Sequence, residues 1–245
     1  MGGHAGCTLL LQSRTMSDSQ ELRIEVPESG GVSALLLRPQ DARWLIALAH
    51  GAGAGMRQPF LQKLAEELAA VGIATLRYQF PYMESRMGVR RRAPDPPTTL
   101  TATVEAAVRT ATAVAPHLPL LAGGKSMGGR MTSQAAAQGL LSEVRGLVFF
   151  GFPLHPPNKP GTSRAEHLAK VSMPMLFLQG TRDTLADLKL LRPVCAKLGK
   201  SATLHIIDSA DHSFHVLKRS GKDDAAVLRE LAERTSSWAE GLGQA

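Results

Sequence analysis

The chain has 245 residues, of which 44% are hydrophobic and 20% are charged, a balance that allows a sizeable core and excludes disorder over most of the length. Its net charge of +7 raises the question of a nucleic-acid partner. However, Arg90–Arg92 form the only dense basic run, and 4% of aromatic residues is too few for stacking platforms, so we expect no nucleic-acid binding.

The first twenty residues carry no convincing structural element, and we expect residues 1–20 to form a disordered extension. Within it, the short apolar run Leu9–Leu11 has no basic n-region before it and does not fit a signal peptide. Met16 is a second candidate for the start of translation. Residues 21–245 contain no linker and no internal repeat, so we predict a single domain there.

Strand-like and helix-like runs then alternate along the chain. Two loosely alternating segments, Glu21–Val26 and Val32–Leu37, flank a Gly-rich turn and predict an antiparallel hairpin. The run Trp44–Leu48 is continuously apolar and predicts a strand buried on both faces, which ends at Ala49. Further strands are predicted at Ile73–Leu76, Leu118–Ala122, Leu147–Phe150, Met175–Leu178 and Leu204–Ile207. The segments with helical periodicity are 60–68, 100–111, the stretch after Ser126, 185–198 and 223–238.

This order predicts an α/β fold: a mostly parallel sheet with helices on both faces and an N-terminal antiparallel hairpin. The Pro-rich stretches Phe80–Pro97 and Phe152–Gly161 are predicted loops. Because no long insertion follows Phe150, we expect no lid domain and an open, shallow site suited to a small substrate.

In open α/β sheets the functional groups gather beyond the C-terminal ends of the strands. After Leu118–Ala122 comes Gly124-x-Ser126-x-Gly128, between a predicted strand and a predicted helix. A strand that turns sharply into a helix forces its central residue to positive φ and leaves no room for side chains two positions away. We therefore predict that Ser126 is a nucleophile at a helix N-terminus, whereas an incidental serine in a Gly-rich turn is the plainer reading.

Small residues also follow Trp44–Ala49, in the sequence His50-Gly51-Ala52-Gly53. Acyl transfer needs two N–H donors for the developing oxyanion. We expect these from Met127, the residue after the nucleophile, and from Ala52, with Gly53 as second choice and as a substrate-binding position. His50 is expected to be structural, with its ring bonded to loop backbone.

Two later strands are followed by the remaining candidates. Asp183 follows Met175–Leu178 and is expected to orient a histidine, although an aspartate here also suits a helix N-cap. His212 follows Leu204–Ile207 and is the predicted base, with His215 as the fallback. The order Ser126, Asp183, His212 is the one expected of a hydrolase triad on this type of sheet. Lys125 is expected to be a packing or hydrogen-bonding residue.

The motifs His50-Gly51-Ala52-Gly53, Arg77-Tyr78-x-Phe80-Pro81-Tyr82 and Gly123-Gly124-Lys125-Ser126-Met127-Gly128-Gly129-Arg130 resemble the α/β-hydrolase superfamily. More narrowly, they are similar to small bacterial predicted hydrolases of dienelactone-hydrolase-like type, whose animal relatives include a testis-expressed protein and a subunit of the non-specific-lethal histone acetyltransferase complex. The resemblance implies the fold and the triad. True dienelactone hydrolases use a cysteine nucleophile, where this chain has Ser126.

The sequence thus predicts a serine hydrolase that forms an acyl-enzyme with a small ester, thioester or related acyl substrate. The alternative is a non-catalytic protein-interaction module that has kept the fold. Arg90 is a candidate for drawing in an anionic substrate, while a solvated basic loop is the plainer reading. The sequence does not indicate an oligomeric state.

Cysteine usage and hydropathy bear on metal binding, membrane insertion and cellular compartment. Cys7 and Cys195 have no metal-type spacing, and no metal or cofactor site is predicted. The apolar runs are strand-sized, so no membrane span is expected, and a reducing cytoplasm fits best.

Overall fold

A computed structural model describes residues 19–84 and 93–243 of the chain. Eight strands form one sheet in the order β1-β2-β4-β3-β5-β6-β7-β8. They are β1 (Gln20–Val26), β2 (Gly30–Leu37), β3 (Trp44–Ala49), β4 (Ile73–Tyr78), β5 (Leu120–Lys125), β6 (Val144–Phe150), β7 (Met175–Gly180) and β8 (Ala202–Ile207). The β1–β2 and β2–β4 pairs are antiparallel, and all other pairs are parallel, which confirms the predicted sheet.

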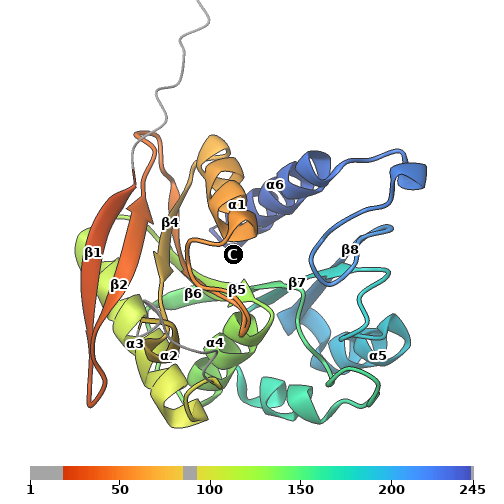
Figure 1. Ribbon diagram of the computed structural model, residues 1–245, viewed down its shortest axis with the longest axis horizontal. Helices are drawn as coiled ribbons and strands as arrows, with labels where there is room; N and C mark the ends of the chain where they lie inside the picture. The colour runs from red at the N-terminus through yellow and green to blue at the C-terminus, as the bar shows by residue number, and fades with distance from the viewer. Residues whose placement is uncertain (1–18, 85–92, 244–245) are drawn as a thin grey trace, which may run out of the picture.

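Helices cover both faces of this sheet (Figure 1). They are α1 (Pro59–Ala70), α2 (Pro81–Glu84), α3 (Pro97–Val114), α4 (Met127–Ala137), α5 (Leu188–Leu198) and α6 (Asp224–Leu242), with a longer 3₁₀ helix, η1 (Ser163–Lys170), and two short ones, η2 (Gly199–Ser201) and η3 (Lys218–Ser220). Helices α1 and α6 pack on one face, where Leu64 and Leu231 are fully buried. Helices α3, α4 and α5 lie with η1 on the other face, around a second apolar cluster that includes Phe149 and Phe177. The central strands β3 to β7 are therefore buried on both sides. The edge strand β8, which contains the predicted buried strand Leu204–Ile207, is only partly buried, because no further strand covers its outer side.

The structure departs from the predicted elements in several places. Strand β5 runs from Leu120 to Lys125, whereas Leu118–Ala122 was predicted. The stretch Phe80–Pro97, predicted as a loop, contains α2 and the first residue of α3. Helix η1 was not predicted. Helix α5 begins at Leu188 rather than at 185, because Asp187 caps it by accepting the Lys189 backbone N–H.

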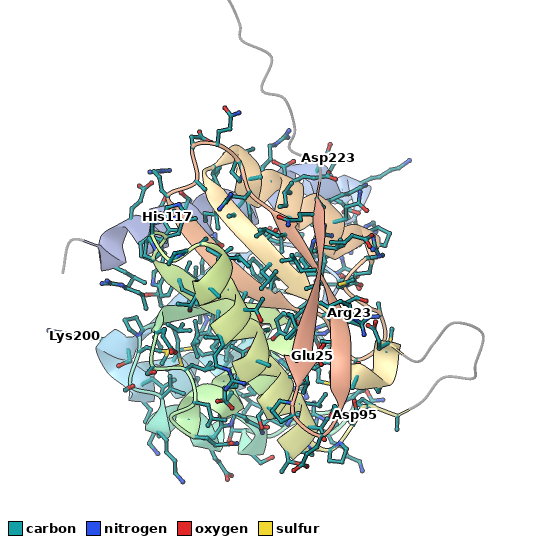
Figure 2. The ribbon with its side chains drawn as sticks, turned by 90° about the vertical axis from the view of Figure 1, so that its left-hand side faces the viewer. Arg23, Glu25, Asp95, His117, Lys200 and Asp223 are labelled. Atoms are coloured by element: carbon teal, nitrogen blue, oxygen red, sulfur yellow. The ribbon has the colours of Figure 1, made fainter. Side chains whose placement is uncertain are left out.

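The hairpin β1–β2 forms the outer edge of the sheet, with Arg23 and Glu25 on β1 (Figure 2). Arg23 donates to a carboxylate oxygen of Glu84 at 2.6 Å, and the Ser33 hydroxyl donates to the same oxygen at 2.6 Å. These bonds join the hairpin to α2, which leads away from β4. The expected N-terminal extension, residues 1–20, lies outside the described residues except for Ser19 and Gln20, and Gln20 opens β1.

The part of the chain that the structure describes contains neither a lid domain nor a membrane-spanning helix. The segment between β6 and β7 carries only η1, so no lid domain is present there. None of the helices in residues 19–84 and 93–243 has the length and hydropathy that crossing a bilayer requires.

Candidate active site

Ser126 lies at the turn between β5 and α4, with φ 53° and ψ −118°, so the predicted positive φ is confirmed. The flanking glycines allow this turn to pack against the end of β3. A Cβ added to Gly124 would lie 2.5 Å from the backbone oxygen of Ala49, and one added to Gly128 would lie 2.6 Å from the backbone oxygen of His50. A side chain at Gly124 would therefore force β5 away from β3, and one at Gly128 would force α4 away from the end of β3.

The structure brings the side chains of Ser126, His212 and Asp183 together. His212 Nε2 lies 2.9 Å from Ser126 Oγ, and His212 Nδ1 lies 2.7 Å from Asp183 Oδ2. Because a carboxylate only accepts, Nδ1 carries the proton and Nε2 is left to accept the serine hydroxyl. This arrangement is suited to removing a proton from Ser126 and to stabilising the imidazolium that results.

The carboxylate of Asp183 is held by several donors in a buried position, with its side chain 1% exposed. Besides His212, the Gln179 side-chain amide donates to Oδ2, and the Leu185 backbone N–H donates to Oδ1 at 2.8 Å. Asp183 thus accepts a backbone N–H at the turn before α5, whereas the N-cap of α5 itself is Asp187. Sequence reasoning missed Gln179, since a buried amide inside a strand gives no periodic signal.

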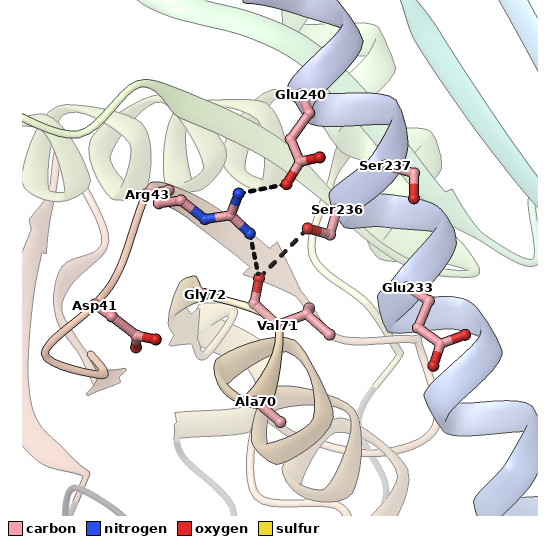
Figure 3. A pocket seen from close by; sticks show the side chains of 9 residues that line it. All are labelled: Asp41, Arg43, Ala70, Val71, Gly72, Glu233, Ser236, Ser237 and Glu240. Carbon is pink, nitrogen blue, oxygen red and sulfur yellow. Dashed lines mark hydrogen bonds and ion pairs between the residues drawn. The ribbon is translucent and has the colours of Figure 1, made fainter. Parts of the chain in front are cut away.

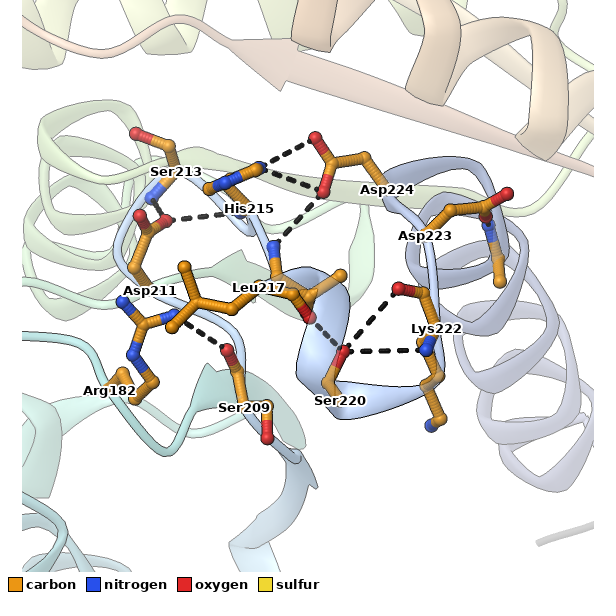
Figure 4. A network of polar contacts seen from close by, with 12 residues as sticks. Arg182, Ser209, Asp211, Ser213, His215, Leu217, Ser220, Lys222, Asp223 and Asp224 are labelled. Carbon is orange, nitrogen blue, oxygen red and sulfur yellow. Dashed lines mark hydrogen bonds and ion pairs between the residues drawn. The ribbon is translucent and has the colours of Figure 1, made fainter.

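The loop that carries His212 is fixed by a network of polar contacts (Figure 4). Asp211 Oδ1 accepts the backbone N–H groups of Ser213 at 2.8 Å and His215 at 3.0 Å, so Asp211 stabilises the turn. The His215 ring turns instead to Asp224, 2.9 Å away at an exposed position. The hydrogen bond to that carboxylate raises the pKa of His215. His215, the fallback base, is thus paired outside the site.

The predicted oxyanion donors lie on both sides of Ser126. Met127 is the first residue of α4, so its N–H belongs to the unpaired N-terminal turn of that helix. Ala52 and Gly53 form an exposed turn after β3. A Cβ built on Gly51 would lie 3.7 Å from Ser126 Cβ, which places this turn directly beside Ser126.

Two side chains orient the peptide groups of that turn. His50 is fully buried; its Nδ1 lies 2.8 Å from the Gly51 carbonyl oxygen, and its Nε2 accepts the Phe80 backbone N–H at 3.0 Å. The ring therefore bonds to loop backbone, as expected. The Tyr82 hydroxyl donates to the Ala52 carbonyl at 3.0 Å. The motif around Phe80 and Tyr82 thus supports the turn, a role that sequence reasoning did not assign.

The remaining predicted site residue is Arg90, and two further histidines have polar partners of their own. Arg90 falls outside the described residues. His205 pairs with Glu230, and His167 lies 2.7 Å from the Ser133 hydroxyl. Burial, and then the charge of Arg130, lower the pKa of His167 to about 4, so it is neutral near pH 7.

A hollow of about 340 Å³ lies between the end of α1 and α6, away from the predicted residues (Figure 3). Arg43 spans it, donating to Glu240 and, at 3.2 Å, to the Val71 carbonyl oxygen. The Ser236 hydroxyl also donates to that oxygen, at 3.3 Å. These contacts join the end of α1 to α6, so the polar groups of this hollow hold the two helices together.

Comparisons with known proteins agree with this architecture. The family model of the alpha/beta hydrolase domain matches residues 42–240. A dienelactone hydrolase from Anabaena variabilis is 24% identical, with 91% of this chain and 97% of that chain covered and a TM-score of 0.68. A serine hydrolase homologue from Coxiella burnetii is 19% identical, covering 89% and 98% with a TM-score of 0.69. A serine hydrolase without lid from Xanthomonas campestris is 21% identical, covering 91% and 97% with a TM-score of 0.64.

Proposed function

This chain belongs to the alpha/beta hydrolase family, and we propose that it is a serine hydrolase that forms an acyl-enzyme on Ser126 with a small ester, thioester or related acyl substrate. The observation that carries the proposal is the pair of contacts from His212, at 2.9 Å to Ser126 Oγ and 2.7 Å to Asp183 Oδ2. A hydroxyl, an imidazole and a buried carboxylate in this order are the groups that acyl transfer uses.

In the proposed reaction, the Ser126 Oγ–H proton passes to His212 Nε2 as Oγ attacks the substrate carbonyl carbon. The oxyanion that forms is bound by the N–H groups of Met127 and Ala52, which need no reorganisation because α4 and the turn after β3 are already in place. The intermediate then expels its alkoxide or thiolate, which takes the proton from His212. A water molecule, deprotonated by His212, then attacks the acyl-enzyme in the same way. The carboxylic acid is released, and Ser126 Oγ takes its proton back from His212.

The substrate class follows from the surroundings of the site. Since no lid covers the described residues and the His212 side chain is 23% exposed, small acyl compounds with access from solvent are favoured. The similar structures include a dienelactone hydrolase and a serine hydrolase without lid, which supports hydrolysis of small carboxylic esters. Ser126 in place of cysteine favours an ordinary ester or thioester over the dienelactone.

The test is an activity screen over p-nitrophenyl esters, thioesters and lactones, together with fluorophosphonate labelling followed by mass spectrometry. We expect label on Ser126, and a loss of about 10⁵- to 10⁶-fold in kcat for Ser126→Ala, by analogy with triad knockouts. A folded wild-type protein that neither takes the label nor turns over any substrate would instead favour a non-catalytic interaction module.

A further inference from the structure

Lys125 is the last residue of β5 and directly precedes Ser126. The residue is 6% exposed, whereas lysines ordinarily reach solvent. It extends into the apolar face covered by α1 and α6, where Nζ lies over the rings of Phe60 and Phe214, 5.9 and 5.4 Å from their centroids. A charged group in such a place needs specific partners, because burying an unpaired ammonium is costly.

The hydrogen-bond partner of Lys125 Nζ is the backbone carbonyl oxygen of His212, at 2.5 Å. The ammonium also lies close to the two other groups on that side of the triad. A Cβ built on Gly151 would lie 3.1 Å from Lys125 Nζ, 3.5 Å from Asp183 Oδ2 and 3.6 Å from His212 Nδ1. Nζ, the carboxylate and the imidazole thus all border Gly151, and Lys125 approaches this point from the strand end that precedes Ser126.

On the proposed function, His212 has to keep two contacts at once, and its backbone lies in a loop beyond the last strand rather than in the sheet. We propose that Lys125 is a positioning residue for the reaction: it ties the His212 backbone to the end of β5, so that the imidazole stays between Ser126 and Asp183. The bond links the residue beside the nucleophile to the residue that carries the base.

Electrostatics are consistent with this placement. Burial lowers the pKa of Lys125 to about 8, and the charges of Asp183 and Asp211 oppose that shift. The side chain is therefore mainly protonated at pH 7. If volume alone were needed, methionine would fill the same space without a charge, and replacing a buried charge by an apolar group of similar size is often neutral or stabilising.

The experiment compares Lys125→Met, which keeps the length and loses the donors, with Lys125→Arg, which keeps charge and donors. Lys63→Met, at an exposed position on α1, is the matched control. We expect Lys125→Met to fold with no loss in Tm, and to lose about 100-fold in kcat with little change in KM, since a misplaced catalytic group has that order of cost. Lys125→Arg should recover part of the rate, and Lys63→Met should match wild type.

A readout independent of turnover is the far-downfield proton resonance of His212 Nδ1–H, which should broaden or disappear in Lys125→Met and persist in Lys63→Met. Should Lys125→Met fail to fold, Lys125→Leu and Lys125→Gln serve in its place, because neither reaches the His212 carbonyl. Wild-type kcat together with an unchanged resonance in a folded Lys125→Met, Lys125→Leu or Lys125→Gln variant would overturn the proposal. If wild type is inactive and unlabelled, the proposed function fails, while the resonance still decides the role of Lys125.

Discussion

The Tyr82 hydroxyl donates to the Ala52 carbonyl, and the His50 ring donates to the Gly51 carbonyl one peptide earlier. In a trans peptide the C=O and N–H point in opposite directions. His50 therefore orients the N–H of Ala52, the proposed oxyanion donor, whereas Tyr82 orients the N–H of Gly53. Substitutions at His50 and at Tyr82 therefore test separately whether the N–H of Ala52 or that of Gly53 binds the oxyanion.

We expect His50→Gln to lower kcat by about tenfold or more, and Tyr82→Phe to lower it by less, because loss of a complete oxyanion donor costs about 10²- to 10³-fold. Steady-state kinetics on one ester, with Tm measured in parallel, make the comparison. The reverse order of the two effects would identify Gly53 as the donor in place of Ala52.

Asp183→Asn should lower kcat by about 10⁴-fold without unfolding the protein. The asparagine oxygen still accepts the Leu185 N–H, but its NH₂ group opposes His212 Nδ1–H and favours the wrong tautomer. Asp187→Asn is the matched control, since Asp187 caps α5 and contacts none of the three site residues. Activity assays of both variants test this, and equal rates would remove Asp183 from the mechanism.

Gly128→Ala should destabilise the fold, because its Cβ would lie 2.6 Å from the backbone oxygen of His50 and 2.7 Å from that of Ala49. Backbone cannot move aside as a side-chain tip does, so we expect a loss of about 3 kcal/mol in the free energy of unfolding. Gly161→Ala, which would meet nothing within 4 Å, should change it by less than about 0.5 kcal/mol. Urea denaturation measures both, and similar midpoints would contradict the close approach of α4 to β3.

The buried lysine predicts a dependence of stability on pH. Burial lowers the pKa of Lys125 from 10.5 to about 8, so between these values the unfolded chain binds a proton that the folded chain does not. The contribution of Lys125 to stability therefore rises with pH through this window, and is lost as the pH falls through 8. We expect the free energy of unfolding of wild type, relative to Lys125→Met, to increase from about pH 8 to pH 10. Denaturation at several pH values measures it, and a constant difference would show that Lys125 titrates normally.

The centre of the sheet was predictable because β3 to β7 are buried on both faces and are therefore rich in apolar residues. The proximity of Ser126, Asp183 and His212 was predictable too, since each follows the C-terminal end of a strand in one parallel sheet. Both inferences use periodicity and chain order.

The contacts that support these three residues leave no comparable pattern in the sequence. Helix α2 lies in a Pro-rich stretch, and the bond from Tyr82 to Ala52 joins positions thirty residues apart. In the sequence, Gln179 and Lys125 are ordinary polar residues at the ends of apolar strands. Only the structure shows that Gln179 donates to Asp183 and that Lys125 donates to the His212 carbonyl. Such contacts depend on the register between loops rather than on any local pattern.

The φ of 53° and ψ of −118° at Ser126 carry an evolutionary consequence. Backbone in this region suits glycine, and holding another residue there costs about 1–3 kcal/mol. Ser126→Gly should thus be more stable than either wild type or Ser126→Ala in thermal melts, although it has no hydroxyl. Selection for stability alone would then favour glycine at this position, so on the proposed function the hydroxyl of Ser126 is kept at a cost in stability.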